Sequence, residues 1–423
     1  MSFKSNVSTI VAALVASITF QNVVADPAYA SGNLTVAGHH RLPPPVTILP
    51  MDNVKSFGAM GDGVTDDTAA IQNAANDAAN KHIGVFFPPG AYLYAGFIQF
   101  NGVAVTGSGS ASFLHAASNS SNCGIVLTGT APSIQNMVLS TVGTPAGGNP
   151  SVVVFNATSF TLANDTFLQG PNYTAVRVQS SSVGAINACT FDASGAPNDA
   201  GVIVEACQNF SIVNSLFQNE AVGVVVDPAN PSQSIALLSN TIGNVTFPTK
   251  IVGILAGGVT TLDIAQNTIQ MASSSSGVLP IEMNLDDNFN VSNNNTWGGQ
   301  IGILVQGSGG TTSNMVSQNL IHNCGNAGIQ SSTFLLPTAI QIMSNQFGEC
   351  GMSDTGNFIS NAVILVTAPG VAGANIFIQN NSYQGHFNGL DSYVTSTITG
   401  PNIPPSHVTG NTVTQAVGLP NNI

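Results

Sequence analysis

Residues 201–217 read GVIVEACQNFSIVNSLF, a phrase with two short apolar runs that ends on an Asn and a large apolar residue. The runs at 201–204 and 210–213 are rich in Val and Ile, and small or polar residues separate them. Short runs of this composition, bounded by turn-forming residues, are typical of β-strands. The phrase therefore predicts two short strands followed by a turn.

The end of this phrase recurs along the chain as an Asn, one or two intervening residues and a large apolar residue. It is found at 164–167, 214–217, 240–242, 267–269, 294–297, 319–321, 345–347, 380–383 and 411–413, and Phe191 fills the one missing position. The apolar residues lie about 24 to 28 residues apart until Phe347, after which the intervals lengthen. Such a period, without a repeated Leu pattern, favours a parallel β-solenoid over leucine-rich repeats. In this stack we expect the Asn side chains to form a ladder along the turns.

The composition excludes several classes of function. The 423 residues are 43% hydrophobic and only 6% charged, with a formal net charge of −13. The basic residues are Lys4, Arg41, Lys55, Lys81, Arg177 and Lys250. Nucleic acid is excluded as a partner because a phosphate backbone requires clustered Lys and Arg. A polyanionic sugar would need a bridging cation such as Ca²⁺, so a neutral glycan is the easier ligand.

The N-terminus carries Lys4, an apolar stretch at 10–20 and the small residues Ala28-Tyr-Ala30, in the order typical of a secretory signal. The apolar stretch is about half the roughly 20 residues that a membrane-spanning helix needs. We predict a signal peptide at 1–30, an extended linker at 31–52 and a C-terminal tail at 416–423. The protein is then secreted, periplasmic or at the cell surface, with no membrane contact after cleavage.

The five cysteines are an odd number for an exported chain. At least one thiol is therefore free or paired between molecules. For Cys324 and Cys350 the sequence leaves two alternatives open, a disulfide or two small buried side chains.

The stretch 54–72, VKSFGAMGDGVTDDTAAIQ, differs from the repeats. Thr65 or Asp66 is expected to cap a helix that begins near Asp67 and continues to Asn80. One face of this helix is apolar, with Ile71, Ala74, Ala75 and Ala78. The stretch 84–90, GVFFPPG, then predicts a strand and a turn.

Phe-Gly-Ala, Gly-Asp-Gly, Thr-Asp-Asp-Thr and Pro-Pro-Gly in this order resemble the N-terminal signature of the pectate lyase superfamily. The motif covers about residues 53–96. The resemblance implies an all-β solenoid over residues 53–415, a right-handed parallel β-helix of about ten or more coils with an N-terminal capping helix. The superfamily includes polygalacturonase-like and rhamnogalacturonase hydrolases, epimerases and phage tailspikes, so the resemblance leaves the chemistry open.

Alignment of the first strand of successive coils brings a polar column together, directly after inward-facing apolar residues. The column contains Gln179, Glu205, Asp227, Gly257, Asn284 and Gln306. Adjacent strands lie about 4.8 Å apart, so Glu205 and Asp227 are expected to be neighbouring carboxylates, one with a raised pKa. We predict Glu205, Asp227 and the nearby Arg177 as catalytic residues, and Gln179, Asn284 and Gln306 as substrate-binding residues.

A second candidate site contains Glu282, Asp286 and Asp287, in a segment that leads to Trp297, the only Trp in the chain. Trp297 could stack on a sugar ring, but it falls on the repeated apolar position and is therefore expected in the core. No His has the spacing of zinc ligands, and no phosphate-binding loop or nucleophile elbow is present in the sequence. We predict no metal or other cofactor, except Ca²⁺ if the substrate is a polyuronate.

Three functions follow, each with polysaccharide as partner. The first is a glycoside hydrolase in which Glu205 and Asp227 act as acid and as base or nucleophile. The second is a lyase or epimerase of uronic acids that uses Arg177 and Ca²⁺. Polygalacturonase-type hydrolases carry Asn-Thr-Asp, Gly-His-Gly and Arg-Ile-Lys motifs that this sequence lacks. The third is a non-catalytic, adhesin-like surface that binds glycans.

Overall fold

The chain divides into two units, residues 1–48 and 49–423, and only the second is described. The computed structural model describes residues 50–117, 123–142, 150–193, 196, 199–243, 251–271, 277–284, 286–307, 313–332, 339–350, 362–367, 375–385, 398–399 and 408–415. The predicted signal peptide and C-terminal tail lie outside these residues. The first strand begins at Met51, so the end of the predicted linker belongs to the solenoid.

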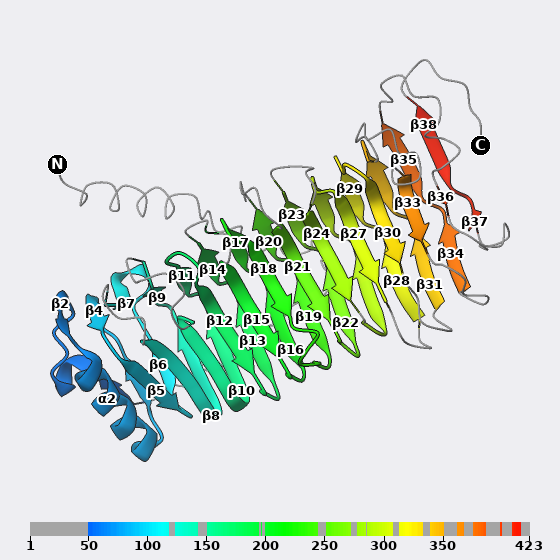
Figure 1. The fold of residues 1–423 in the computed structure, drawn as a ribbon. Helices are drawn as coiled ribbons and strands as arrows, with labels where there is room; N and C mark the ends of the chain where they lie inside the picture. Colours follow the sequence, from blue (N-terminus) through cyan, green and yellow to red (C-terminus); the bar gives the residue numbers. More distant parts are fainter. Residues whose placement is uncertain are drawn as a thin grey trace, which may run out of the picture. The chain divides into compact units, whose positions relative to one another are not determined.

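The second unit is a parallel β-helix, as the sequence predicted (Figure 1). Its described strands form two sheets. Sheet A has 24 described strands and sheet B has 14. The described strands pair in parallel, and each strand pairs with the equivalent strand one coil later. Sheet A contains two strand columns, which the long strands β8 and β10 join.

The first strand column carries the predicted polar column on its outer face. Its strands are β5 (Phe97–Asn101), β8 (Gly124–Gln135), β10 (Val152–Ala163), β12 (Thr174–Gln179), β15 (Ala200–Glu205), β18 (Val222–Val226), β21 (Ile251–Gly257), β24 (Val278–Asn284), β27 (Ile301–Gln306), β30 (Ala327–Ser332), β33 (Ala362–Thr367) and β36 (Ile398–Thr399).

The second strand column follows the first within each coil. Its strands are β1 (Met51–Asn53), β3 (Gly84–Phe86), β6 (Ala104–Thr106), β13 (Gly184–Asn187), β16 (Phe210–Val213), β19 (Ile235–Leu238), β22 (Leu262–Ala265), β25 (Phe289–Ser292), β28 (Ser313–Ser317), β31 (Ala339–Met343), β34 (Asn375–Gln379) and β37 (Val408–Thr409).

Sheet B closes each coil with a short strand. Its strands are β2 (Asp62–Asp66), β4 (Gly90–Tyr94), β7 (Ser112–Ala116), β9 (Val138–Ser140), β11 (Thr166–Leu168), β14 (Thr190–Asp192), β17 (Leu216–Gln218), β20 (Thr241–Gly243), β23 (Thr268–Gln270), β26 (Asn295–Trp297), β29 (Leu320–His322), β32 (Gln346–Gly348), β35 (Ser382–Gly385) and β38 (Thr412–Gln415).

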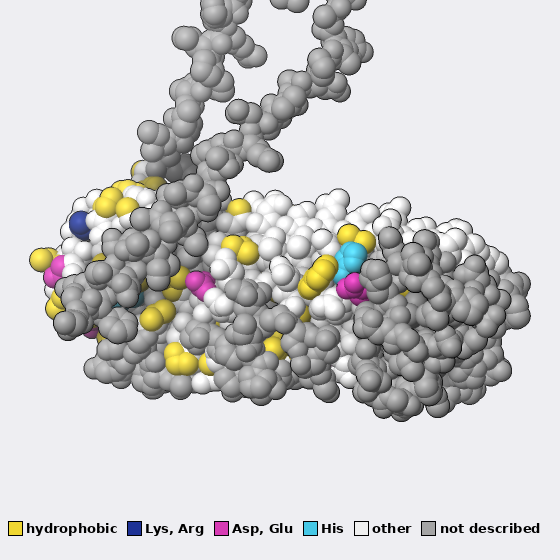
Figure 2. Space-filling model, turned by 90° about the horizontal axis from the view of Figure 1, so that it is seen from above, with side chains coloured by type: hydrophobic (Ala, Val, Ile, Leu, Met, Phe, Trp, Pro, Cys, Tyr) yellow, Lys and Arg dark blue, Asp and Glu magenta, His cyan; other side chains and the backbone are white. Residues whose placement is uncertain are grey.

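The core lies between the sheets and is filled by alternate residues of each strand. On β15, Val202 and Val204 are buried in the core while Ile203 points outward. Equivalent core residues stack from coil to coil, as the rings of Phe167, Phe191 and Phe217 do at centroid separations of 4.9 and 4.6 Å. Charged side chains are sparse on the described part of the surface in Figure 2.

The predicted Asn ladder is present at the turn between the second strand column and sheet B. Asn294 is typical, because its Nδ2 donates to Ile264 O at 2.8 Å and to Asn319 Oδ1 at 3.0 Å. Its own Oδ1 accepts from both nitrogens of Asn267. The same pattern joins Asn240, Asn267, Asn294, Asn319, Asn345, Asn381 and Asn411.

Three of the predicted ladder residues have a different role. Asn164, Asn214 and Asn380 adopt left-handed backbone conformations, with φ of 56°, 54° and 56°. The ladder position is the residue that follows each of them, because the left-handed residue turns the chain into the ladder. It is occupied by Asp165, Ser215 and Asn381 in these coils.

The capping helix α2 spans Thr68–Lys81, and Ile71, Ala74, Ala75 and Ala78 are buried as predicted. It begins one residue later than expected, with Asp67 at the N-cap position. The Asp67 carboxylate accepts instead from Met60 N and Gly61 N, and Asp66 Oδ1 accepts from Thr68 N. Two short 3-10 helices, η1 (Val54–Phe57) and η2 (Gly109–Ala111), complete the N-terminal coils.

All five cysteines are buried and none forms a disulfide in this structure, so Cys324 and Cys350 are two small buried side chains. Burial raises the pKa of the Cys324 thiol well above its usual range. Among the described residues, no helix is long and apolar enough to cross a membrane.

The Asn ladder predicts a sharp difference between two adjacent residues. Asn294→Ala removes four hydrogen bonds and leaves buried partners unsatisfied, which is expected to cost about 3 kcal/mol of unfolding free energy. The neighbouring Asn295 is exposed, and Asn295→Ala is expected to cost less than about 0.5 kcal/mol. Urea unfolding of both variants checks this, and equal midpoints would contradict the ladder's role.

Asp165 predicts a dependence of stability on pH. Its Oδ1 accepts from Met137 N at 3.0 Å, its Oδ2 is buried without a partner, and burial raises its pKa to about 8. A carboxyl with a raised pKa contributes stability below its ordinary value near 3.8, and this contribution is lost as the pH rises through 8. Asp165→Asn is expected to flatten this slope and to stabilise the fold by about 1 kcal/mol at pH 8. Thermal unfolding from pH 5 to pH 9 measures it, and an unchanged slope would contradict the assignment.

Candidate functional site

The predicted polar column is present on the outer face of the first strand column. The register pairs Gln179 with Glu205, and it aligns Gly257, Asn284 and Gln306 on three consecutive strands. Asp227 directly follows β18, and its backbone N–H donates to Val204 O at 2.9 Å. The alignment made from the sequence is therefore confirmed, although the roles of these residues stay predictions.

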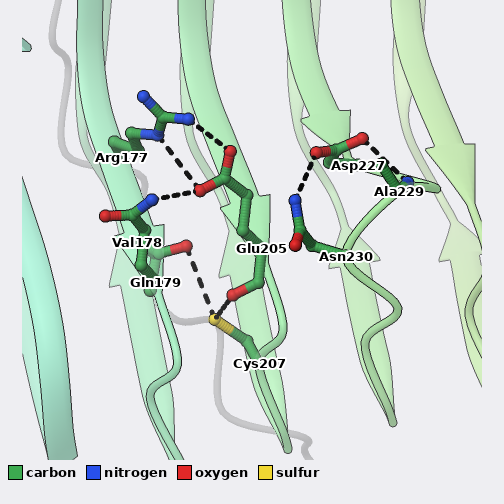
Figure 3. Close-up of polar contacts among 8 residues, drawn as sticks. All are labelled: Arg177, Val178, Gln179, Glu205, Cys207, Asp227, Ala229 and Asn230. Carbon is green, nitrogen blue, oxygen red and sulfur yellow. Dashed lines mark hydrogen bonds and ion pairs between the residues drawn. The ribbon is translucent and has the colours of Figure 1, made fainter.

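Glu205 forms the centre of a hydrogen-bonded network (Figure 3). The Arg177 guanidinium donates two hydrogen bonds to the Glu205 carboxylate, from Nε to Oε2 at 3.1 Å and from Nη2 to Oε1 at 2.5 Å. Gln179 Nε2 also donates to Oε2. The Glu205 side chain is 8% exposed and the Arg177 side chain 40%, so the guanidinium is the part of the pair that faces solvent. We call Arg177, Gln179, Glu205 and Asp227 the Arg177 cluster.

This network lowers the pKa of Glu205, mainly through the hydrogen bonds from Arg177. The neighbouring Asp227 opposes the shift only as the weakest of the contributions. The raised pKa that the sequence predicted for one of the two acids is therefore not found on Glu205. The alignment of strands could predict the neighbouring acid, but it did not include the direct contact of Arg177.

Asp227 lies on the next coil and is partly buried. Its Oδ1 accepts from Ala229 N at 3.0 Å, and its Oδ2 accepts from Asn230 Nδ2 at 2.8 Å. In Figure 3 its carboxylate points to these residues, and the Glu205 carboxylate points to Arg177. The two acids are close along the helix axis but bind different partners.

Phe155 extends the same column by one coil, and the sequence analysis did not find it. It pairs with Gln179 in the register and its side chain is 44% exposed. The alternation of Val152 and Val154 with the residues between them is the signal that could have predicted an outward-facing Phe155. An exposed aromatic ring therefore stands beside the Arg177 cluster.

The remaining candidates do not join this cluster. Asn284 Nδ2 donates to Glu282 Oε1 at 3.3 Å, and Glu282 is buried on the outer face between Leu255 and Leu304. These Leu residues belong to, or pack against, a separate apolar cluster. Gln306 is partly exposed, two coils beyond Gly257.

Asp286 and Asp287 act in the local turn. Asp286 is buried, its Oδ1 accepts from Val259 N at 2.9 Å, and burial raises its pKa to about 7. Asp287 Oδ1 accepts from Asn288 N at 2.9 Å. Among the described residues, no three His, Cys, Asp or Glu side chains lie together in a way that could hold a metal ion.

The predicted core position of Trp297 is wrong. Thr296 is fully buried in the stack, paired with Ile269, and Trp297 is 46% exposed on the outer face of sheet B. The reason is a fixed offset, because the core residue always follows the ladder residue by two positions, as Ile242 follows Asn240 and Thr296 follows Asn294.

The sequence analysis did not find a second polar cluster, formed by Gln169 and Glu220. Both residues lie in turns that follow strands of sheet B and belong to no repeated motif. Gln169 Nε2 donates to Glu220 Oε1, and both residues are buried. Burial raises the pKa of Glu220 well above its usual range, and the nearby Asp199 adds to the shift. Burial therefore favours the neutral, protonated form of Glu220.

The Arg177–Glu205 pair predicts an asymmetry between single and double variants. Arg177→Ala leaves Glu205 without its main partner, and at pH 7 it is expected to cost about 1 to 2 kcal/mol, moderated by the exposure of the guanidinium. Because the pKa of Glu205 is lowered, this loss is fully present above the ordinary value of 4.5 and disappears as the pH falls through the lowered pKa. Glu205→Gln in the Arg177→Ala background should recover part of it in urea unfolding. Additive losses would contradict the coupling.

Comparison with known proteins gives one family. The model of the family described as rhamnogalacturonase A/epimerase, pectate lyase-like, matches residues 51–278. The mannuronan C5-epimerase AlgE1 of Azotobacter vinelandii is 61% identical over 46 residues, which is 10% of this chain and 3% of that protein. The chain thus spans only a few per cent of the length of the curated relatives that it matches.

Two solved structures are similar over most of the chain. The A-module of the A. vinelandii mannuronan C-5 epimerase AlgE4 has a TM-score of 0.45 and 16% identity, covering 88% of this chain and 97% of that one. The Streptococcus pneumoniae surface adhesin PfbA has a TM-score of 0.48 and 15% identity, covering 71% and 90%.

The family model covers more than half of the 423 residues, and it agrees with the N-terminal signature and with the parallel β-helix. The chain therefore belongs to the rhamnogalacturonase A/epimerase, pectate lyase-like family.

Proposed function

We propose that this chain acts on a polysaccharide outside the cytoplasm, and that the sugar chain binds across the first strand column at the Arg177 cluster. The observation that carries the proposal is the Glu205 network, which holds a partly exposed guanidinium in one fixed geometry. Arg177 keeps N–H donors on its solvent side, because only Nε and Nη2 bind Glu205. A rigid donor group of this kind is suited to sugar hydroxyls.

The neighbours of Arg177 supply the other contacts that a sugar needs. Phe155 offers an exposed ring on one side, against which the C–H face of a sugar can pack. Asp227 offers carboxylate oxygens on the other side. It is near enough to Arg177 to contribute to the raised pKa of the guanidinium. Aromatic, donor and acceptor groups therefore follow one another along the axis of the β-helix.

The local charge favours a neutral glycan. The positive charge of Arg177 is already paired with Glu205, and Arg177 is the only Lys or Arg after Lys81 among the described residues. A uronate would therefore find no unpaired positive charge here, unless a cation such as Ca²⁺ bridged it to the protein.

Hydrolysis is the reaction that we propose for the bound chain, and the network gives the two acids different roles. The lowered pKa of Glu205 suits a group that stays ionised, as a base or nucleophile does. Proton donation to the leaving oxygen then falls to Asp227, which has no Arg partner. A lyase or epimerase and a purely binding surface are the other outcomes of the test.

The proposal predicts a defined product. The purified chain on a panel of neutral and acidic polysaccharides is expected to release new reducing ends from a neutral glycan, without the absorbance near 235 nm that elimination produces. Asp227→Asn and Glu205→Gln are each expected to lower this rate by at least about 100-fold. Phe155→Ala should raise KM more than it lowers kcat, because it removes binding alone.

Other outcomes identify what is wrong with the proposal. Full activity in both acid variants would exclude the Arg177 cluster as the hydrolytic site. Absorbance near 235 nm that depends on Arg177 and Ca²⁺ would instead assign a lyase. Binding without any product would leave only the glycan-binding role.

A further inference from the structure

The outer face of sheet B carries a band of exposed, uncharged side chains. We call this set the sheet B band. It consists of Thr241, Thr268, Gln270, Asn295, Trp297 and Gln346, on β20, β23, β26 and β32. These side chains are hydroxyls, amides and one indole, and no Asp, Glu, Lys or Arg lies on strands β20, β23, β26, β29 and β32.

Trp297 has a position that the core does not require. The stack takes Thr296 as its core residue, although Ile269 and Ile321 fill the equivalent position in the two neighbouring coils. Nearly half of this side chain stays in contact with solvent, at 46% exposure. A single exposed aromatic is common on protein surfaces, so Trp297 points to a ligand only together with its neighbours on sheet B.

His322 extends the aromatic surface to the next coil. It pairs with Trp297 in the register, and the two ring centroids lie 5.5 Å apart with planes tilted by 34°. Burial lowers the pKa of His322, so the ring is neutral at pH 7, and Glu349 is the acid that opposes this shift. Figure 2 shows a histidine beside hydrophobic side chains and an acidic one, on a face whose other described side chains are mostly uncharged.

The chemistry of the sheet B band fits one class of ligand. A polyanion would find no positive charge on these strands. A stable protein interface needs several apolar anchors over a large area, whereas here a single Trp is surrounded by exposed Thr, Gln and Asn. A neutral sugar combines apolar C–H faces, which pack on an aromatic ring, with hydroxyls that bond to amides.

We propose that the sheet B band is a second glycan-binding surface, in which Trp297 stacks on a neutral polysaccharide. The inference shares the ligand class of the proposed function, but it does not depend on the Arg177 cluster, which lies on the other sheet. The band runs along the axis, and its strands repeat about every 4.8 Å. A longer sugar chain therefore contacts more coils, and affinity is expected to rise with the length of the oligosaccharide.

The sequence provides a direct probe, because Trp297 is the only Trp in the chain. Titration of the full chain with soluble neutral polysaccharides (dextran, laminarin, xylan and glucomannan) is expected to shift the Trp emission to shorter wavelength and to protect it from acrylamide quenching. The shift is expected with at least one of these polymers and to strengthen with chain length.

Variants separate binding by Trp297 from binding elsewhere. In co-sedimentation with the same polysaccharides in insoluble form, Trp297→Ala is expected to weaken binding at least 10-fold and Trp297→Phe by less, because Phe keeps a stacking ring. Phe97→Ala is the matched control, since Phe97 is an aromatic on sheet A that is 53% exposed. It should leave binding unchanged.

The outcomes distinguish this inference from the proposed function. Unchanged emission with every polymer, or equal binding by Trp297→Ala and wild type, overturns the sheet B band. An emission shift that depends on protein concentration without glycan also overturns it, because a second copy of the chain then covers Trp297. Loss of binding in Trp297→Ala would support the sheet B band. If Arg177→Ala also kept full binding and full activity, the Arg177 cluster would be excluded as the site of the proposed function.

Discussion

The hydrogen bonds between successive coils determine almost every other feature of this protein. Each strand pairs in parallel with its equivalent one coil later, and the Asn ladder adds side-chain bonds of 2.8 to 3.1 Å at the same turn. Asn can do this because its amide donates to a carbonyl below and to the next Asn, while its oxygen accepts two bonds from the preceding coil. The register cannot slip by one residue without exposing the core side chains of that coil.

A fixed register turns the surface into columns of equivalent residues. The Arg177 cluster and Phe155 lie on one column of sheet A, and Trp297 and His322 lie on one column of sheet B. Residues about 25 positions apart in the sequence are therefore direct neighbours, which is how a chain with so few charged residues brings Arg177 and Glu205 together. A linear polymer that lies along the axis meets the same columns coil after coil.

The sequence predicted the fold and the register because both follow from a repeat that every coil obeys. It predicted Glu205 beside Gln179 for the same reason. It placed Trp297 in the core because the distance from Asn to the apolar residue was allowed to vary, whereas in the structure the core residue is always the second residue after the ladder residue. It missed the Arg177–Glu205 bonds and the buried Glu220, because these depend on side-chain directions and turns that no repeat describes.

Stacking also explains why so few charges remain. Like charges at equivalent positions would face each other about 4.8 Å apart along a column, a distance at which their repulsion is considerable. Several acids on the coils have a local compensation. Asp165 and Asp286 have it in a raised pKa, and Glu205 has it in Arg177. A protonated acid needs no basic side chain beside it. The ion pair needs one, and Arg177 is the only Arg or Lys after Lys81 among the described residues. The Arg177–Glu205 ion pair, on coils that carry few charged residues, is the physical reason to look for function at Arg177 first.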